Sequence, residues 1–550
     1  MRKGMFAVLL IVMIPALAFA AGVKEKAPIT GDAHRMVSLS DVVRWDYEVD
    51  MIVVGYGMAG ATAVLEATNI KPDASILIFE KMPVELQGGQ TKASGQSLLQ
   101  VHPDGLADFR KYYTRCFDSN PLPKDYFEWF TSQFTLQLDW IKSVIEPVGY
   151  EIGYQGGGPL VWGKKVTEFP EFPGSNFLAC TTAIREKGYP GFQYGGDWDG
   201  FSAAVEARMK KLPNIKLLWE TPVVSLIQDT KTRTVWGVVA KDADGKLITA
   251  KARKGVVVAC GGYESNMEMN KHFNGSQEVY NTGNEGNTGD GVEMMMAVGA
   301  KMWHFDNQTR SGGEVPGIKV PDFPTSFIRE ILPQRWDWIE LSKGNERFYD
   351  ESRRYSTQHW KYYDKGTGNY IDLKHFRSLP VHMIFDDDMR KAGPIVSTWF
   401  AAPITTYNYK WSKDNSVEIN KGWIIKADSI EELAKKINRD PKEMKAAVDA
   451  YNEMCKNGVD TEWGREKAKL MPIDTPPFYA VSETPCLPAT SGGAMRNTKS
   501  QVLDWNENAI PQLYEAGELG SFVPNLYQNG TFLMEAIFSA RAAVQDIFRK

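Results

Sequence analysis

The sequence predicts an α/β fold, and three stretches of it support that prediction. An apolar run rich in β-branched residues, 49–54, leads into a Gly-x-Gly-x-x-Gly turn and a small-residue stretch typical of a helix. A second apolar run, 74–79, ends at Glu80, and a third, 255–258, again ends in glycines. Buried strands that alternate with helices and end at glycine-rich turns are typical of a parallel sheet.

The glycine-rich turn predicts a dinucleotide site. Gly55 permits the tight turn, Gly57 lets the backbone approach a pyrophosphate, and Gly60 lets the helix pack closely on the strand. The helix N-terminus then faces the phosphates. Glu80 follows Gly60 by twenty residues, where a carboxylate accepts hydrogen bonds from an adenosine ribose. NAD and FAD both fit this pattern, but a second glycine-rich loop with hydroxyl side chains, residues 88–95, favours the longer FAD.

The N-terminus predicts export. Residues 1–20 combine a basic start, an apolar run at 6–17 and small residues before a cleavage point after Ala20. An uncleaved membrane anchor is the alternative, but the run is short for a bilayer and contains Pro15. We therefore expect a periplasmic or otherwise exported protein with no stable membrane insertion after cleavage.

Charge and cysteine spacing exclude several classes of function. The formal net charge is -5, from 63 Lys and Arg against 68 Asp and Glu, with no basic stripe, which disfavours nucleic acid as a partner. Five cysteines lie far apart without a Cys-x-x-Cys pair, so covalent haem and iron-sulfur clusters lack ligands. We expect no metal site, and we expect the run Asp386, Asp387 and Asp388 to end a strand in a solvated loop.

Composition divides the rest of the chain. Residues 21–45 are expected to form a poorly structured lead, and 46–299 the first part of the nucleotide-binding domain. Residues 300–471 are aromatic and punctuated by proline, which predicts a second domain inserted into the first; residues 472–550 complete the first domain.

Local patterns predict individual elements. Aromatic residues at helical spacing in 104–148 predict helices packed over the core. Ser429 and Asp440 are each followed by an acid three positions later, which predicts two helix starts. The last helix is expected at 531–548, and strands are expected at 215–219, 222–228, 234–240 and 246–252, with a hairpin turn at Asp244 and Gly245.

Together these motifs resemble the FAD-dependent fumarate reductase and succinate dehydrogenase flavoprotein family. The matching segments occur in the family's order over nearly the whole mature chain: 55–60, 80–81, 88–95, 258–264, 287–291, 347–351, 491–493 and 514–518. The resemblance implies a Rossmann-like FAD-binding domain of the glutathione-reductase type with an inserted α+β capping domain. It also implies that the substrate is clamped between the two domains beside the flavin ring.

The resemblance also implies which residues bind FAD. Glu518 would bond the ribitol chain, Val224 the adenine edge, and the backbone at Phe532 and Leu533 the pyrimidine end of the flavin. Members with covalent FAD carry a histidine just before the second glycine-rich loop, and residues 83–87 contain none, so FAD should be non-covalent. The other implied cofactor residues are Gly55, Gly57, Met58, Ala59, Gly60, Glu80, Lys81, Gly89, Gln90, Thr91, Ser94, Gly95, Ala259, Gly261, Gly262 and Asp290.

Departures from the family pattern concern the substrate. Tyr355 and Tyr527 stand where fumarate reductases carry arginines, and Pro488 and Ala489 stand where they carry paired histidines. A small dianion would therefore lack its charge partners. The two tyrosines are similar to those of the 3-ketosteroid dehydrogenase branch. That resemblance implies that Tyr355 moves a proton and that Tyr527 donates a hydrogen bond to a ketone oxygen.

The expected function is hydride transfer between flavin N5 and the activated C=C bond of a bulky, enone-like substrate. Reduction is the favoured direction, with electrons from an external cytochrome, flavoprotein or quinone-linked partner; a 3-ketosteroid-type dehydrogenase runs the reverse. A phenol with a pKa of about 10 is a fitting proton donor for reduction. In dehydrogenation it needs a lower pKa, for which Arg353 or Arg354 is a candidate.

Two alternatives stay open. One is a reductase of an unsaturated carboxylic acid, of the fumarate, urocanate or arylacrylate type, in which Arg353 or Arg354 grips the carboxylate. The other is a non-catalytic flavin electron carrier. The cap with its Arg-Phe-Tyr-Asp-Glu segment argues against a carrier, because a carrier needs an exposed flavin.

Replacing Tyr355 tests the proton-transfer assignment. We expect Tyr355→Phe to retain FAD and to lose turnover roughly 100-fold or more, because the phenol would supply the proton. The measurement compares bound flavin absorbance with the steady-state rate of the variant. Unchanged turnover would remove Tyr355 from the mechanism.

Overall fold

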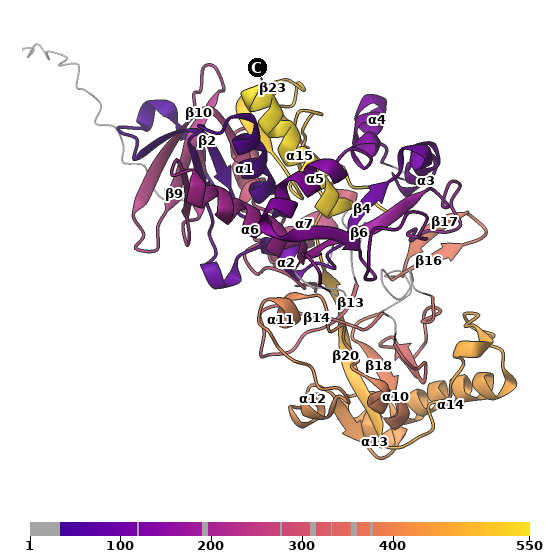
Figure 1. Ribbon diagram of the computed structural model, residues 1–550. Coiled ribbons are helices and arrows are strands. Elements are labelled where there is room, and N and C mark those ends of the chain that lie inside the picture. The colour runs from indigo at the N-terminus through magenta and orange to yellow at the C-terminus, as the bar shows by residue number, and fades with distance from the viewer. Residues whose placement is uncertain are drawn as a thin grey trace, which may run out of the picture.

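The computed structural model describes residues 34–117, 120–189, 196–275, 278–307, 315–331, 333–353, 360–373 and 378–549, which form two lobes (Figure 1). The larger lobe contains the indigo, magenta and yellow parts of the chain, and the smaller lobe contains the orange part. The expected signal peptide and most of the expected lead lie outside the described residues. Within the described residues, no helix is both long and apolar enough to span a bilayer.

A nine-stranded sheet organises the larger lobe. Strand β10 (Leu247–Val258) lies between β2 (Tyr47–Val54) and β23 (Ala509–Glu515) and is parallel to both. Beyond β2 the sheet continues through β3 (Ile76–Phe79) to β7 (Ile215–Leu218), again in parallel. Every residue of β3 is buried, as expected for a strand covered on both faces. The predicted α/β fold is confirmed.

Two predicted strands are one strand in the structure. Residues 246–252 and the run from 255 both belong to β10, with a register shift between Ala252 and Gly255. The first half of β10 pairs antiparallel with β9 (Val235–Lys241), whereas the second half pairs with β23. The two halves of β10 therefore have different neighbours on one side, and we predicted them from the sequence as two separate strands. The remaining predicted strand is β8 (Val223–Gln228), and Gly245, at φ +81°, forms the predicted hairpin turn.

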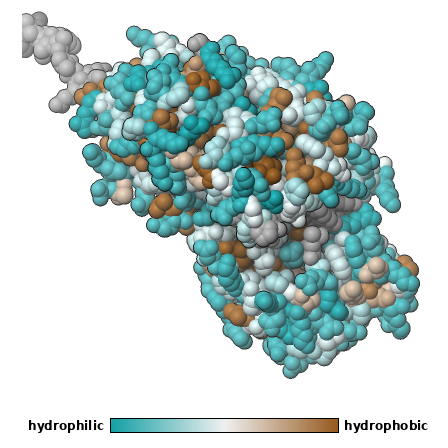
Figure 2. Space-filling model, in the orientation of Figure 1, coloured by the Kyte–Doolittle hydropathy of each residue, from teal (hydrophilic) through white to brown (hydrophobic). Residues whose placement is uncertain are grey.

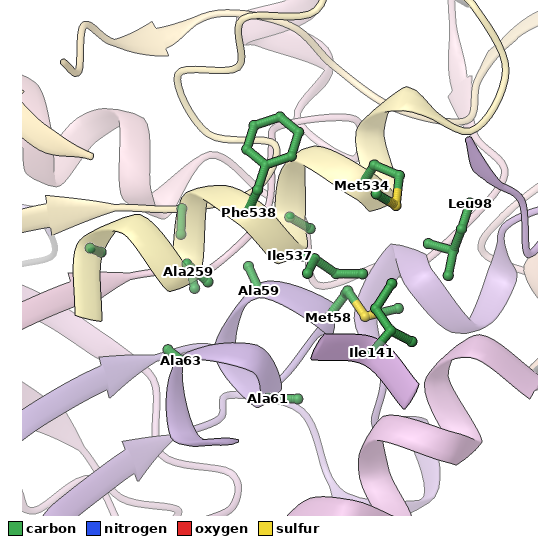
Figure 3. Packing of buried hydrophobic residues seen from close by; sticks show 14 of the residues in the cluster. Met58, Ala59, Ala61, Ala63, Leu98, Ile141, Ala259, Met534, Ile537 and Phe538 are labelled. Carbon is green, nitrogen blue, oxygen red and sulfur yellow. The ribbon is translucent and has the colours of Figure 1, made fainter. Parts of the chain in front are cut away.

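Helices α1 (Met58–Ile70) and α15 (Thr531–Phe548) pack together against the sheet. Figure 3 shows small side chains of α1, including Ala59, beside Ile537 and other apolar residues of α15. Alanine side chains permit this close approach because little volume separates the two backbones. The predicted bounds of the last helix are confirmed.

The aromatic region predicted to be helical also packs onto this core. Helices α3 (Leu106–Phe117), α4 (Lys124–Gln133) and α5 (Leu138–Ile145) are observed there. The Phe134 and Phe538 rings meet edge to face with centroids 5.5 Å apart, a favoured aromatic arrangement. The lobe is completed by β1 (Val37–Ser38), α2 (Gly89–Ala93), β4 (Leu98–Val101), β5 (Tyr150–Tyr154), β6 (Ala179–Glu186), α6 (Gly196–Lys211), α7 (Met267–Asn274), α8 (Asp290–Ala297) and β22 (Gln501–Leu503).

The smaller lobe, which we call the cap, is built on a second sheet. Its central strand β20 (Phe478–Leu487) pairs with β18 (Val381–Phe385) and β13 (Val315–Ile318). Helices α13 (Ile430–Lys436) and α14 (Pro441–Asn457) pack against each other, and their starts are capped by Ser429 and Asp440 as predicted. The remaining strands of this sheet are β11 (Tyr280–Asn281), β14 (Phe327–Ile328), β15 (Trp338–Leu341) and β19 (Ile425–Ala427).

Other short elements complete the cap. They are helices α10 (Asp387–Ala392), α11 (Ala402–Thr405) and α12 (Ser416–Asn420). The hairpin of β16 (Lys361–Asp364) and β17 (Asn369–Asp372) instead packs on the larger lobe, where the Tyr370 and Phe169 ring centroids lie 4.7 Å apart (Figure 1). Figure 2 shows that the visible face of the cap is mainly hydrophilic. This distribution suits a lobe that is solvated on most sides.

After β11, which already joins the cap sheet, the chain passes to the rest of the cap and back through two adjacent strands. Outgoing β12 (Met302–Trp303) pairs antiparallel with returning β21 (Gly493–Ala494). Strand β20 belongs to the cap sheet although it follows the expected domain boundary at 471–472. The cap sheet therefore extends past that boundary, because pairing and not composition decides which sheet an apolar strand joins.

The acidic run follows the end of β18 as predicted, but Asp386 and Asp387 are buried instead of solvated, and only Asp388 is partly exposed. Asp386 is 1% exposed and caps α10 by accepting from the backbone N–H groups of Asp388 and Met389. Burial and the neighbouring Asp337 raise the pKa of Asp386 to about 7. The side chain of Asp387 pairs with Arg390. Among the described residues, no cluster of His, Cys, Asp and Glu side chains suits a metal ion.

Candidate active site between the lobes

A cavity of about 570 Å³ lies where the parallel strands of the larger lobe end and the cap begins. Ligands of α/β proteins bind at this edge of the sheet. Val315, Ile328 and Phe400 of the cap complete its wall. Of the predicted cofactor residues, those that line the cavity are Gly55, Gly57, Met58, Ala59, Glu80, Lys81, Gly89, Gln90, Thr91, Ser94, Gly95, Ala259, Gly261, Asp290, Glu518, Phe532 and Leu533.

The three glycines of the turn have different surroundings. Gly55 has φ +99°, and a side chain there would lie 2.5 Å from the carbonyl oxygen of Ala259. A side chain at Gly60 would overlap the carbonyl oxygen of Gly55. At Gly57, in contrast, the nearest atoms would be 3.9 Å away, and Gly57 lines the cavity. Gly55 and Gly60 therefore allow the packing, whereas Gly57 leaves room for a ligand at the start of α1.

Glu80 is held rigidly at the end of β3. Its two carboxylate oxygens accept from the backbone N–H groups of Tyr56 and Met82, each at 2.8 Å. Burial raises the pKa of Glu80, and these two hydrogen bonds oppose the rise. A carboxyl group fixed in this way has remaining lone pairs for the hydroxyl groups of a ribose.

An ion pair lies beside Glu80. Lys81 Nζ donates to Asp290 Oδ2 and to the Thr288 hydroxyl, both at 2.8 Å. Burial would raise the pKa of Asp290, but the Lys81 charge and these hydrogen bonds lower it overall. Asp290 is therefore ionised at neutral pH and fixes the start of α8 at the cavity wall.

Gln90 ties the second glycine-rich loop to the end of the cap strand β20. Its side-chain amide donates to the Pro488 carbonyl at 2.8 Å and to Asn281 Oδ1 at 3.1 Å. Its carbonyl accepts from the backbone N–H of Asn284 at 2.5 Å. Gln90 thus lines the cavity while its polar atoms hold three chain segments together.

Three predicted cofactor residues lie outside the cavity wall. Gly60 packs inside the turn, and a side chain at Gly262 would overlap the Thr490 hydroxyl. The carbonyl of Val224 accepts from the backbone N–H of His34 at 2.6 Å, and its neighbour Val223 lines the cavity instead. The register of β8 shifts at this point, so the alternation of faces could not be read from the sequence.

A buried pair of carboxyl groups lies at the cavity wall, where Glu518 lines the cavity. Glu518 accepts from the backbone N–H of Thr490 at 2.5 Å and from its hydroxyl at 3.0 Å. Glu264 lies beside it and is 1% exposed. Burial raises the pKa of both groups, and the charge on Glu518 raises the pKa of Glu264 further. Folding therefore favours the protonated form of Glu264.

Tyr527 and the start of α15 form the far end of the cavity. The Tyr527 ring stacks on Phe532, with centroids 5.2 Å apart, and its hydroxyl oxygen accepts from the backbone N–H of Gly530 at 3.1 Å. Burial raises the pKa of Tyr527, so the phenol is protonated at neutral pH. Accepting one hydrogen bond makes a hydroxyl a better donor of another.

The other two predicted catalytic residues, Tyr355 and Arg354, lie outside the described residues. The segment just before them is fixed by buried charges. Glu351 pairs with Arg347 at 2.8 Å and with Arg465 at 2.7 Å. Burial would raise the pKa of Glu351, but the two guanidinium groups lower it to about 2. Arg353 donates to Asp350 Oδ2 at 3.2 Å.

Sequence reasoning missed Glu264 and the aromatic pair Trp399 and Phe400, which line or adjoin the cavity. An ionisable residue at the end of an otherwise apolar, glycine-rich run was the available signal for Glu264. Trp399 and Phe400 line the cavity but lie more than 300 residues after the glycine motif in the sequence. No rule of spacing from that motif predicts their position.

The residues of this cavity fit a dinucleotide: an open glycine at a helix start, a fixed carboxylate for a ribose and a long wall that spans both lobes. Residues 50–531 match the model of the family described as FAD binding domain. The chain belongs to this family. It binds FAD, and Gly57, Glu80 and Glu518 line the cavity whose residues fit that cofactor.

Three similar proteins illustrate the family. Digoxin reductase of Eggerthella lenta is 26% identical over 86% of this chain and 82% of its own length. Urocanate reductase of the same organism is 24% identical over 86% of this chain and 70% of its own. The structure of 3-ketosteroid Δ1-dehydrogenase from Sterolibacterium denitrificans superposes with a TM-score of 0.71 at 19% identity, covering 92% of this chain and all of that one. This last match shows that the fold is shared.

Alanine at Gly60 and alanine at Gly57 should impair different properties: the first the stability of the protein, the second its binding of FAD. Gly60→Ala should destabilise the protein by about 1–3 kcal/mol, because the new side chain meets backbone atoms. Gly57→Ala should leave the stability of the apoprotein within about 1 kcal/mol, because space is available, yet weaken FAD binding at least tenfold. Urea unfolding of apoprotein and flavin titration measure the two effects. Equal stability losses would contradict the assignment.

The Glu264–Glu518 pair should make stability pH-dependent. A carboxyl group whose pKa is raised by folding contributes stability that is complete below its unfolded pKa and is lost as the pH rises through its folded pKa. Glu264→Gln removes one such group and keeps a donor for Glu518, so its stability should fall less between about pH 5 and pH 9. Thermal unfolding midpoints across this range measure the difference.

Glu453→Gln, a matched change at an exposed residue of α14, is the control and should follow the wild type, because its partner Lys456 does not titrate in this range. If Glu264→Gln and the wild type have the same pH profile, the pair does not share a proton.

Proposed function

We propose that this protein is an exported FAD-dependent ene-reductase for a neutral, bulky, enone-like substrate. The observation that carries the proposal is the composition of the cavity end beside Tyr527. Phe532 stacks on Tyr527, Trp399 and Ile328 line the same cavity, and no arginine lines it among the residues that the structure describes. Of the two lysines in the wall, Lys81 is paired with Asp290 and Lys165 is exposed to solvent. A small dicarboxylate needs cationic partners to repay its desolvation, whereas an enone needs one donor for its carbonyl oxygen.

Tyr527 is the donor that this chemistry requires. The hydride comes from FAD when it is bound, and negative charge then develops on the carbonyl oxygen of the substrate. A protonated phenol held in a low-dielectric site stabilises that charge. Tyr355 remains our candidate for the proton transfer to carbon, and Arg354 for a charge beside it.

The two curated relatives support reduction as the direction, since both are named as reductases. The signal-like residues 1–20 support export, and they imply that the cofactor is acquired outside the cytoplasm if the chain is exported unfolded. The sequence has no Cys-x-x-Cys-His motif for a covalent haem, and we propose that the electrons come from an external cytochrome, flavoprotein or quinone-linked donor.

The test is anaerobic reoxidation of the dithionite-reduced, FAD-loaded protein, followed by flavin absorbance, with fumarate, arylacrylates, cyclic enones and 3-ketosteroids. We expect ketones to reoxidise the flavin fast, and we expect Tyr527→Phe to slow them roughly 100-fold. Tyr47→Phe, at the opposite end of β2, is the matched control and should keep the wild-type rate. Fast reoxidation by fumarate or an arylacrylate alone would overturn the proposal in favour of a carboxylate reductase.

A further inference from the structure

A short cap segment, residues 399–402, docks onto the larger lobe through its backbone. The N–H of Ala401 donates to the carbonyl of Ala93 at the end of α2, at 2.9 Å. The N–H of Ala402 donates to the carbonyl of Thr282 at 2.7 Å. These hydrogen bonds join the cap to segments that line the cavity, and they depend on backbone atoms alone.

Ala401 adopts a conformation that residues other than glycine rarely take. Its φ and ψ are 75° and 143°, and the residue is fully buried. Strained backbone persists only where its surroundings hold it, and such strain clusters at functional sites. Here the hydrogen bond from Ala401 to Ala93 of the larger lobe and the bond from Ala402 to Thr282, just after β11, hold it. The strained turn directs the preceding two residues to the cavity wall.

Those two residues are aromatic. Trp399 and Phe400 line the cavity, and their ring centroids lie 4.4 Å apart. Trp399 covers Gly95, where a side chain would come within 3.3 Å of the indole ring. Gly95 lies at the end of the loop predicted to wrap FAD, so Trp399 meets the cofactor-binding segment directly. Tyr527 and Phe532 form a second aromatic pair in the wall of the same cavity.

We propose that Trp399 and Phe400 determine substrate specificity by forming an aromatic wall for a flat, fused-ring or aryl-substituted enone. The docked Ala401 turn fixes the position of this wall. The inference rests on the proposed function and names its substrate class. A planar apolar ring system gains from contact with aromatic faces and from burial of its area, whereas a small enone leaves this wall uncovered.

The experiment compares two ketones that share a reacting group and differ in size: 2-cyclohexen-1-one and 4-androstene-3,17-dione. Steady-state KM and kcat are measured for the FAD-loaded holoenzyme with dithionite as the reductant. Trp399→Leu should raise KM for the fused-ring ketone roughly tenfold, since loss of an aromatic contact is worth about that factor. Its KM for the small ketone and kcat for both should change less than about threefold.

Two further variants control for structure. Trp505→Leu changes a tryptophan that is 67% exposed on a hairpin turn and should leave both KM values as in the wild type. Ala401→Gly fits the observed φ and ψ without strain and should also preserve both values. If Trp399→Leu does not retain FAD, Phe400→Leu provides the same comparison of the two ketones.

The outcomes separate the two proposals. Equal changes for both ketones, or no change for either, would overturn the role of the aromatic wall while the ene-reductase proposal stands. If neither ketone reoxidises the wild-type enzyme and an unsaturated acid does, the proposed function itself fails.

Discussion

The close contact between the glycine turn and the end of β10 is the constraint on which the rest of the structure depends. Gly55 and Gly60 have no room for a side chain because backbone atoms of Ala259 and of the turn itself occupy that space. This contact sets the position of α1 above the sheet, and α15 packs on α1 in turn. The N-terminal ends of both helices therefore reach the same cavity, one at Gly57 and the other at Phe532.

Much of the larger lobe could be predicted because its signals are local. The glycine turn acts within a few residues, so the sequence displays it directly, and the capping residues Ser429 and Asp440 are equally local signals in the cap. The strand break predicted before Gly255 is wrong for the opposite reason. Only pairing with β9 and β23, which are distant in the chain, shows that β10 continues.

The candidate site was predictable in part for the same reason. Most implied cofactor residues line the cavity, because the family motifs are short and their spacing is fixed. Val224 does not, because the register shift in β8 moves the wall to Val223. The partnership of Glu264 with Glu518 joins residues more than 250 positions apart, and no sequence rule links two buried acids across that separation.

The shape of the cavity also depends on the cap, which contacts the larger lobe through several defined contacts. The paired strands β12 and β21 carry the chain in and out, Gln90 bonds to the chain just after β20, and the turn at Ala401 bonds to α2. Gln90, Pro488 and Ala93, which make the last two of these contacts, line the cavity. A substrate enclosed there is held by walls from both lobes, so the geometry of the lobes relative to each other sets the shape of the site. Trp399 packs over Gly95 of the second glycine-rich loop, which is predicted to wrap FAD. The position of that loop when FAD is bound should therefore affect the position of the Trp399 side chain that the substrate would meet.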